Sequence, residues 1–275
     1  MIRFEKTEVT GWQAAIRGMR NPMNSWERSD SDYGCEEGKC DDCDNTGDFF
    51  DLLGCEYRNY VVGPNDHDLM MRLANGGPVH AKYRRMIAVY VDITAPLYWW
   101  KEFDTYKVGT VANSCSTMHK IHAKEFTLED FSCEHLFNGE EVDIYSMNVL
   151  KMTIDSLNAA RKKYLETKAK DYWWQMIQLL PSSYNQKRTV MLNYEVLANI
   201  YKSRKNHRLD EWAVHSSSIP DSTSQTLYSK DLPFGFCDWI KTLPYSELIT
   251  GEHFLTHDEI MEKLDKWAKD AEREV

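Results

Sequence analysis

A block of small polar side chains, from Asn113 to Thr117, is the part of this sequence whose residue types best suit a small ligand. The block follows Lys107 and Gly109, which offer a positive charge and a backbone that a ligand can approach closely. Hydroxyl, thiol and amide groups in such a run place hydrogen-bonding groups around a phosphate or the edge of a base. The alternative interpretation is a serine-rich turn at the surface.

A second candidate site is a cysteine-rich segment with the spacing C-x4-C-x2-C-x11-C, formed by Cys35, Cys40, Cys43 and Cys55. A C-x2-C pair lets two thiolates hold one metal from a tight turn, and two further cysteines would complete a tetrahedral zinc site. The first three cysteines also match a plant-type iron–sulfur loop, but the fourth comes too soon. The acidic neighbours favour the remaining alternative, an acidic surface loop with reduced cysteines that bind no metal.

The charge balance limits the partners of this chain. Its 43 acidic residues outnumber 33 lysines and arginines, for a formal net charge of −10, which excludes a broad surface for nucleic-acid polymers. A local basic group can still hold one small anion. No apolar run approaches the roughly 20 residues of a membrane span, and the opening residues lack a signal-peptide pattern. We therefore expect a cytoplasmic protein without disulfides.

The elements that must position these residues form one expected domain, 1–275. It carries a Cys-rich acidic insertion at 34–56 and a mobile Ser/Thr-rich loop at 216–230. Hydrophobic spacing and capping residues predict helices over 11–19, 65–74, 97–103, 142–167, 171–180, 185–204 and 257–274. Alternating apolar residues predict strands over 4–9 and 86–93.

The segment APLYWWKEFDTYKVGTVANSCSTMH resembles the signature region of flavin-dependent thymidylate synthases. In that family an Ala-Pro-aromatic helix leads into R-H-R-x-x-S-x-x-E-x-S-x-R. His80 falls on the first histidine of the family's upstream G-H-x-x-P-F-E-H segment. The family's helix N-x-R-x-L-x-x-F-x-x-x-R matches NYEVLANIYKSR at Asn193, Leu197 and Arg204, and His207 and Trp212 follow at nearly the family's distance.

Several charged positions of the family differ in this chain. Thr105, Tyr106 and Lys107 replace the Arg-His-Arg triplet. The later motif positions, the second upstream histidine and the helix arginine are replaced by Thr110, Asn113, Cys115, Thr117, Met86 and Glu195. The resemblance therefore supports the family's fold better than its activity. It also predicts weakened FAD binding, because Tyr106 cannot supply the positive charge that arginines offer to a diphosphate.

The resemblance implies an α+β fold, in which an antiparallel sheet is flanked by long helices. It also implies a homotetramer with sites between subunits that bind FAD, a deoxyuridine monophosphate, a folate and a reduced nicotinamide. Carried over by position, the expected cofactor-binding residues are His80, Lys82, Thr105, Asn113 and Asn193. The expected substrate-binding residues are Glu102, Thr110, Ser114, Ser116, Thr117, Glu195, Arg204 and His207.

The expected catalytic residues are Cys115, Lys107 and Tyr106. A thiolate at Cys115 could add to C6 of a pyrimidine and activate C5, whereas the alternative is a small buried thiol that fills a serine-sized space. Glu195 would accept a hydrogen bond from a cytosine amino group better than from a uracil carbonyl, unless it faces solvent or pairs with a lysine. Arg204 and His207 could bind a phosphate or only stabilise a helix end.

The resemblance therefore implies a divergent relative of the flavin-dependent thymidylate synthases that binds a pyrimidine nucleotide and that, if it is an enzyme, modifies this nucleotide at C5. The alternative is a catalytically inactive nucleotide-binding or assembly protein that keeps the fold. The lost charges favour the second interpretation, and the polar block with Cys115 favours the first.

Overall fold

The computed structural model describes residues 2–35, 58–136, 145–215 and 234–252. Its strands are β1 (Arg3–Thr10), β2 (Asp32–Cys35), β3 (Arg58–Val61), β4 (Ala88–Pro96), β5 (Val111–Ser114) and β6 (Asn185–Asn193). Its α-helices are α1 (Trp12–Arg20), α2 (Pro64–Asn75), α3 (Leu97–Phe103), α4 (Thr117–Lys120), α5 (Ser146–Thr167), α6 (Lys170–Leu179), α7 (Tyr194–Arg204), α8 (Phe236–Lys241) and α9 (Glu247–Thr250). Its 3-10 helices are η1 (Asn21–Met23), η2 (Trp26–Arg28), η4 (Ala81–Met86) and η5 (Leu128–Asp130).

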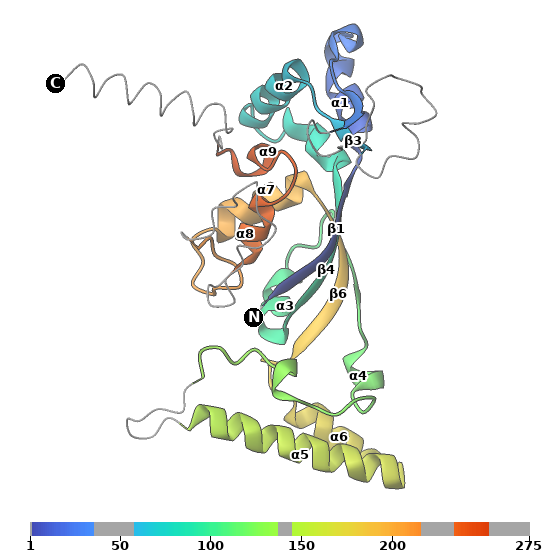
Figure 1. The fold of residues 1–275 in the computed structure, drawn as a ribbon, viewed down its shortest axis with the longest axis vertical. Coiled ribbons are helices and arrows are strands. Elements are labelled where there is room, and N and C mark those ends of the chain that lie inside the picture. The colour runs from blue at the N-terminus through green and yellow to red at the C-terminus, as the bar shows by residue number, and fades with distance from the viewer. Residues whose placement is uncertain (1, 36–57, 137–144, 216–233, 253–275) are drawn as a thin grey trace, which may run out of the picture.

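An antiparallel four-stranded sheet in the order β1-β4-β6-β5 forms the centre of the molecule (Figure 1). The long pair β4–β6 runs in register from Ala88 opposite Asn193 to Pro96 opposite Asn185. Alternate side chains point to opposite faces of a strand, so Val89, Val91 and Ile93 share one fully buried face. A short β2–β3 hairpin makes a separate two-stranded sheet.

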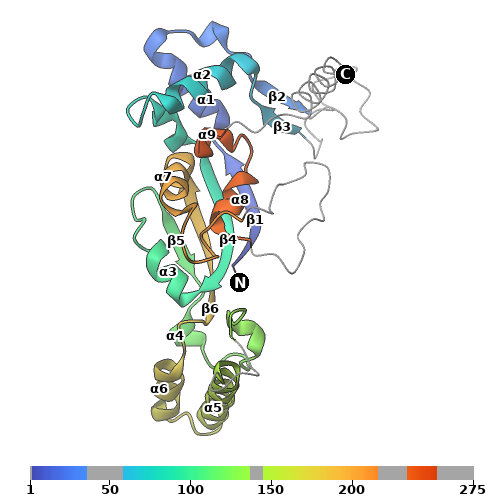
Figure 2. The same cartoon turned by 90° about the vertical axis from the view of Figure 1, so that its left-hand side faces the viewer.

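Helices α3, α7 and α8 pack on the buried face of the sheet, the face that is turned to the left in Figure 1 and toward the viewer in Figure 2. Trp212, in the segment between α7 and α8, packs between α3 and α8: its ring centroid is 4.6 Å from that of Trp99 on α3 and 5.4 Å from that of Phe236 on α8. The side chains on the other face include Tyr90 and Thr189, which are exposed. The core therefore lies between one face of the sheet and three helices.

Helices α5 and α6 lie between β5 and β6 in the sequence and extend beyond one end of the sheet (Figure 1). They enclose a second hydrophobic cluster. Leu150, Ile154 and Leu157 recur at helical spacing on α5 and are buried against Met176 of α6. The sequence predicted both helices from this spacing. Together with the sheet, they confirm the α+β fold class.

The predicted helix over 185–204 is wrong in its first half, which forms strand β6. Residues 185–193 pair with β4 on one side and β5 on the other, and Val190 and Leu192 are fully buried. Buried residues thus recur every second position, and a helix would not place residues with this spacing on one buried side. The polar block also differs from a plain loop, because its first residues, 113 and 114, belong to β5.

Several predicted segments lie outside the described residues: most of the insertion at 34–56, the loop at 216–230 and the helix at 257–274. Within the described residues, no helix combines the length and apolar character needed to cross a bilayer.

Candidate functional site

An arginine in the last turn of α7 joins two segments that are far apart in the sequence. Arg204 Nη1 donates to Glu102 Oε2 over 2.7 Å, and its Nε donates to Tyr106 Oη over 2.8 Å. The guanidinium also lies 5.0 Å from the centroid of the Trp212 ring, a distance that suits a cation–π contact. The fold thus brings the end of α3 to the end of α7.

His207 completes this group, which we call the Arg204 cluster: Glu102, Tyr106, Arg204 and His207. The His207 Nε2 atom lies 2.8 Å from Arg204 Nη1 and 3.6 Å from Glu102 Oε2. The side chains of Glu102, Arg204 and His207 are 34%, 19% and 24% exposed, so a ligand can reach them from solvent. The cluster holds a carboxylate acceptor beside guanidinium and imidazole groups.

The loop between α3 and β5 runs along α7 from its last turn to its first. Tyr106 contacts the last turn, and Gly109, with φ +75°, packs on the first. A Cβ atom at Gly109 would lie 2.9 Å from Asn193 Nδ2 and 3.1 Å from Val196 Cγ2. Asn193 caps the helix, because its Oδ1 accepts the Val196 backbone N–H over 3.0 Å.

Three other predicted residues lie on this loop. Lys107 is exposed and has no acidic partner among the residues described. Thr105 Oγ1 donates to the Glu102 carbonyl over 2.7 Å. Thr110 is half-buried, and its Oγ1 has no hydrogen-bond partner in the described part of the chain. The loop therefore offers one unpaired cation and one unused hydroxyl beside α7.

The polar block lies farther along the sheet. Asn113 pairs with Thr189 and Ser114 with Arg188, and the Cys115 backbone N–H donates to the Lys187 carbonyl over 3.0 Å. Residues 113–116 are exposed; Ser116 Oγ caps α4, and Thr117 Oγ1 accepts a hydrogen bond from Gln186.

Cys115 therefore does not meet Asn193 within one chain. Its partner Lys187 lies six residues before Asn193 on an extended strand, a separation of about 20 Å at the usual strand rise. Gly109 is at the Asn193 end, whereas Lys107 follows Tyr106 at the last turn of α7. The single chain thus brings the loop and α7 together and holds the thiol far from Asn193 and the first turn of α7.

Glu195 is buried and faces neither solvent nor a lysine. Its Oε2 lies 3.7 Å from Nη1 of Arg84, and the two side chains are 11% and 12% exposed. Glu195 Oε2 and Arg84 Nε have no hydrogen-bond partner within the described residues. Sequence reasoning missed Arg84 because nothing in a basic run shows which of its members turns inward.

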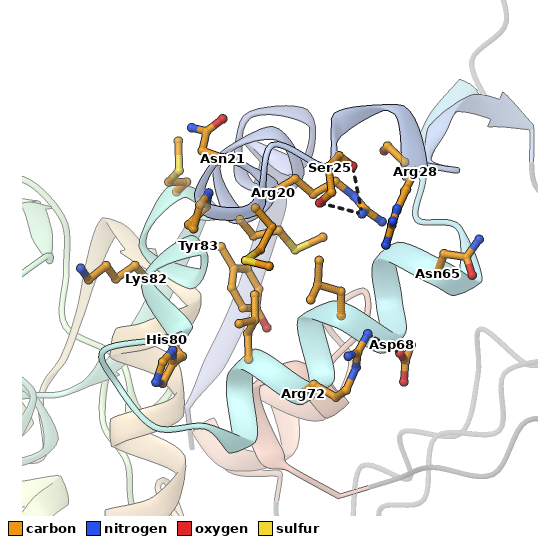
Figure 3. Close-up of a pocket in the computed structure, with 18 of the residues that line it drawn as sticks. Arg20, Asn21, Ser25, Arg28, Asn65, Asp68, Arg72, His80, Lys82 and Tyr83 are labelled. Carbon is orange, nitrogen blue, oxygen red and sulfur yellow. Dashed lines mark hydrogen bonds and ion pairs between the residues drawn. The ribbon is translucent and has the colours of Figure 1, made fainter.

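A groove of about 1360 Å³ lies between α1, the η1–η2 turn, α2 and η4 (Figure 3). Apolar side chains line much of it: Met19, Leu69, Leu73, Val79 and Met86. Arg28, His80 and Lys82 also line it and have no acidic partner in the described ranges, whereas Arg72 pairs with Asp68 over 2.8 Å. Burial raises the pKa of Tyr83 to about 12, so this groove residue stays a neutral phenol and donates to the Met70 carbonyl.

One fully buried carboxylate fixes a wall of this groove. Asp66 on α2 accepts hydrogen bonds from Arg20 Nε at 2.6 Å, from Ser29 Oγ and Ser31 Oγ at 2.7 Å each, and from the Asp30 N–H at 3.1 Å. Burial raises the pKa of Asp66, but the hydrogen bonds from Ser29, Ser31 and Arg20 together outweigh burial, and the net pKa is lowered. The carboxylate therefore stays charged and holds the 20–31 segment against α2.

The predicted zinc site cannot be placed in the structure. Cys35 ends β2, and Cys40, Cys43 and Cys55 lie outside the described residues. Among the residues that are described, no group of three or more His, Cys, Asp or Glu side chains could hold a metal ion. Zinc binding by the cysteine segment stays a prediction.

Comparison with known proteins supports the fold. No protein-family model and no curated protein matches this sequence. A solved structure of thymidylate synthase X (ThyX) from Helicobacter pylori with FAD and dUMP has a TM-score of 0.52 at 15% identity, over 91% of this chain and 98% of that one. The chain is thus an α+β protein with a ThyX-like fold.

Two further solved structures are similar at lower scores. Flavin-dependent ThyX from Helicobacter pylori complexed with FAD and dUMP has a TM-score of 0.48 at 15% identity, covering 76% of this chain and 87% of that one. The UMP/dUMP methylase PolB from Streptomyces cacaoi bound with 5-Br UMP has a TM-score of 0.44 at 12% identity, covering 78% and 80%.

Proposed function

We propose that this protein binds a pyrimidine nucleotide and that the Arg204 cluster contacts the base. The observation that carries the proposal is the carboxylate of Glu102 held 2.7 Å from Arg204 Nη1. Phosphate would place a second anion beside Glu102, which like-charge repulsion disfavours. A base edge instead presents N–H donors and acceptors together, and both have counterparts in the cluster.

The phosphate of the nucleotide has a separate candidate contact. Lys107 follows Tyr106 directly, is exposed and has no acidic partner in the described part of the chain. A cation one residue from the cluster can bind a phosphate while the base lies against Arg204. We therefore assign the phosphate to Lys107 and the base to the Arg204 cluster, in place of the phosphate site expected at Arg204 and His207.

The groove of Figure 3 is our candidate site for FAD, the cofactor in the similar structure of ThyX. Its volume of about 1360 Å³ exceeds the usual small-molecule pocket of roughly 300–1000 Å³, which suits a dinucleotide. The apolar lining suits the flavin ring, and Arg28 and Lys82 can pair with the diphosphate. When bound, the flavin would supply hydride transfer; His80 and Lys82 would hold it in the groove.

Modification at C5 would require the Cys115 thiolate to reach the bound base, from the same chain or from another copy in a homotetramer. It would add to C6 and be eliminated after C5 is substituted. The separation of about 20 Å is between Cys115 and Asn193, at the start of α7, whereas the Arg204 cluster lies at the end of that helix. The second candidate function is a nucleotide-binding protein without catalysis, which the charges missing from the family motif favour.

Titration calorimetry with dUMP and dCMP tests the binding proposal. We expect the wild type to bind at least one of them, and Arg204→Met to bind it at least tenfold more weakly. The control is Lys202→Met, which removes an exposed cation from the same turn of α7. Equal affinity in both variants, or no binding by the wild type, would refute the proposal. A flavin absorption band in the purified protein tests the groove independently.

A further inference from the structure

Both ring nitrogens of His207 face hydrogen-bond donors. The backbone N–H of Leu209 donates to Nδ1 over 3.2 Å, and Arg204 Nη1, which carries only donors, lies 2.8 Å from Nε2. A neutral imidazole has one acceptor nitrogen and one N–H, and a protonated imidazole has no acceptor. No protonation state of His207 satisfies both contacts.

The hydrogen bond from the Leu209 backbone to His207 identifies the ring nitrogen on which a proton is least unfavourable in free energy. If Nδ1 carried the proton, the half-buried Leu209 amide would lose its acceptor, and an unpaired backbone donor is costly. If Nε2 carries the proton, Leu209 is satisfied and Nε2–H points toward the cluster, with Glu102 Oε2 3.6 Å away. The mismatch then lies between two side chains, Arg204 and His207, which can both move.

We propose that His207 recognises the base of the bound nucleotide as an Nε2–H donor. An acceptor atom of the ligand would then take the place between the two donors, His207 Nε2–H and Arg204 Nη1, that face each other in the free protein. This inference rests on the proposed function. One ligand acceptor can take hydrogen bonds from both Arg204 Nη1 and His207 Nε2. The adjacent N–H of the ligand then donates to Glu102 Oε2. The ligand class is a planar ring with an N–H donor beside an acceptor.

Uracil and cytosine share this chemistry. Uracil offers N3–H beside a carbonyl oxygen, and cytosine offers its amino group beside the acceptor N3. A phosphate or a carboxylate lacks the N–H that Glu102 requires. The arrangement therefore selects the pairing edge of a base, and methyl groups on that edge should block it.

The first test examines the free protein and needs no nucleotide. Nitrogen-15 NMR of histidine-labelled protein at pH 8, with the His207→Gln variant used to assign the signal, reports which ring nitrogen carries the proton. We expect the proton on Nε2. A proton on Nδ1, or on both nitrogens, would overturn the inference whatever the protein binds.

The second test is titration calorimetry with two ligand pairs: dUMP against 3-methyl-dUMP, and dCMP against N4,N4-dimethyl-dCMP. We expect methylation of the preferred nucleotide to weaken binding at least tenfold, and the preferred pair identifies the base. His207→Leu should weaken it at least tenfold too, whereas His207→Gln, which keeps an N–H donor, should restore most of the affinity. His119→Leu, an exposed histidine on α4, is the control.

The outcomes separate this inference from the proposed function. Binding that tolerates the methyl groups, or a His207→Leu variant that is folded by circular dichroism and binds as tightly as wild type, overturns the role of His207 alone. A wild type that binds neither nucleotide overturns both.

Discussion

Replacing Asp66 by Asn should remove a large part of the stability of this protein. Asp66 is fully buried and accepts four hydrogen bonds, one of them from the guanidinium of Arg20 at 2.6 Å. Asparagine keeps the shape of the side chain but has no charge, and its amide group would turn a donor toward other donors. Arg20, which is 4% exposed, would then be left without its counter-ion.

The size of the effect follows from this burial. Breaking a buried ion pair by removing one partner costs roughly 3–5 kcal/mol, against a typical total stability of roughly 5–15 kcal/mol. The matched control is Asp68→Asn on the same helix. Asp68 pairs with Arg72 in an exposed i,i+4 arrangement, with side chains 66% and 68% exposed. Such a pair contributes only about 0.3–0.5 kcal/mol.

Urea unfolding followed by circular dichroism measures both variants. At pH 7 we expect Asp66→Asn to lose about 3 kcal/mol or more and Asp68→Asn less than about 0.5 kcal/mol. The folded pKa of Asp66 is lowered, so its contribution is present above the unfolded value of about 3.9 and is lost as the pH falls through the folded value. The deficit of Asp66→Asn should therefore shrink only below about pH 4. A loss equal to that of Asp68→Asn would refute this reasoning.

Two further predictions concern the loop on α7 and the contact between α2 and α9. Gly109→Ala should destabilise the protein by about 1–2 kcal/mol from the positive φ alone, and more because its Cβ meets Asn193. Gly77→Ala is the control, because the φ of Gly77 is also positive and no atom lies within 4 Å of its added Cβ. Equal losses of unfolding free energy for the two variants, measured with urea, would contradict the effect of the contact with Asn193. His67 Nε2 donates to Glu247 Oε1 over 2.7 Å, and this hydrogen bond raises the pKa of His67. Its contribution is present below the unfolded pKa of about 6.5 and is lost as the pH rises through the folded value, so His67→Gln should lower Tm more at pH 6 than at pH 9.

Periodic segments could be predicted from the sequence, and segments with competing patterns could not. The buried row Leu150, Ile154 and Leu157 has one spacing that fits a helix and no other element. Residues 185–193 carry polar ends around a short apolar run, and their pairing partners, β4 and β5, lie far away in the sequence. The alternation of Val190 and Leu192 is too short to distinguish this strand from the start of the helix that follows it.

The candidate site could also be predicted only in part from the sequence. The resemblance placed Tyr106 and Arg204 in one site, and a hydrogen bond of 2.8 Å joins their side chains. It also placed both Cys115 and Asn193 there, but one chain holds these two residues about 20 Å apart. Arg84 and Asp66 were missed, because burial and ion pairing depend on which residues pack around a side chain.

The sequence by itself determined the two helices of the second core and the residue types available to a nucleotide, because these depend on local spacing and chemistry, and its resemblance to a known family implied the α+β class. Only the tertiary structure decided that Glu102 lies against Arg204 and that both nitrogens of His207 meet donors. The physical reason is that hydrogen bonds act over about 3 Å, and a chain sets distances of that size between remote residues only by folding.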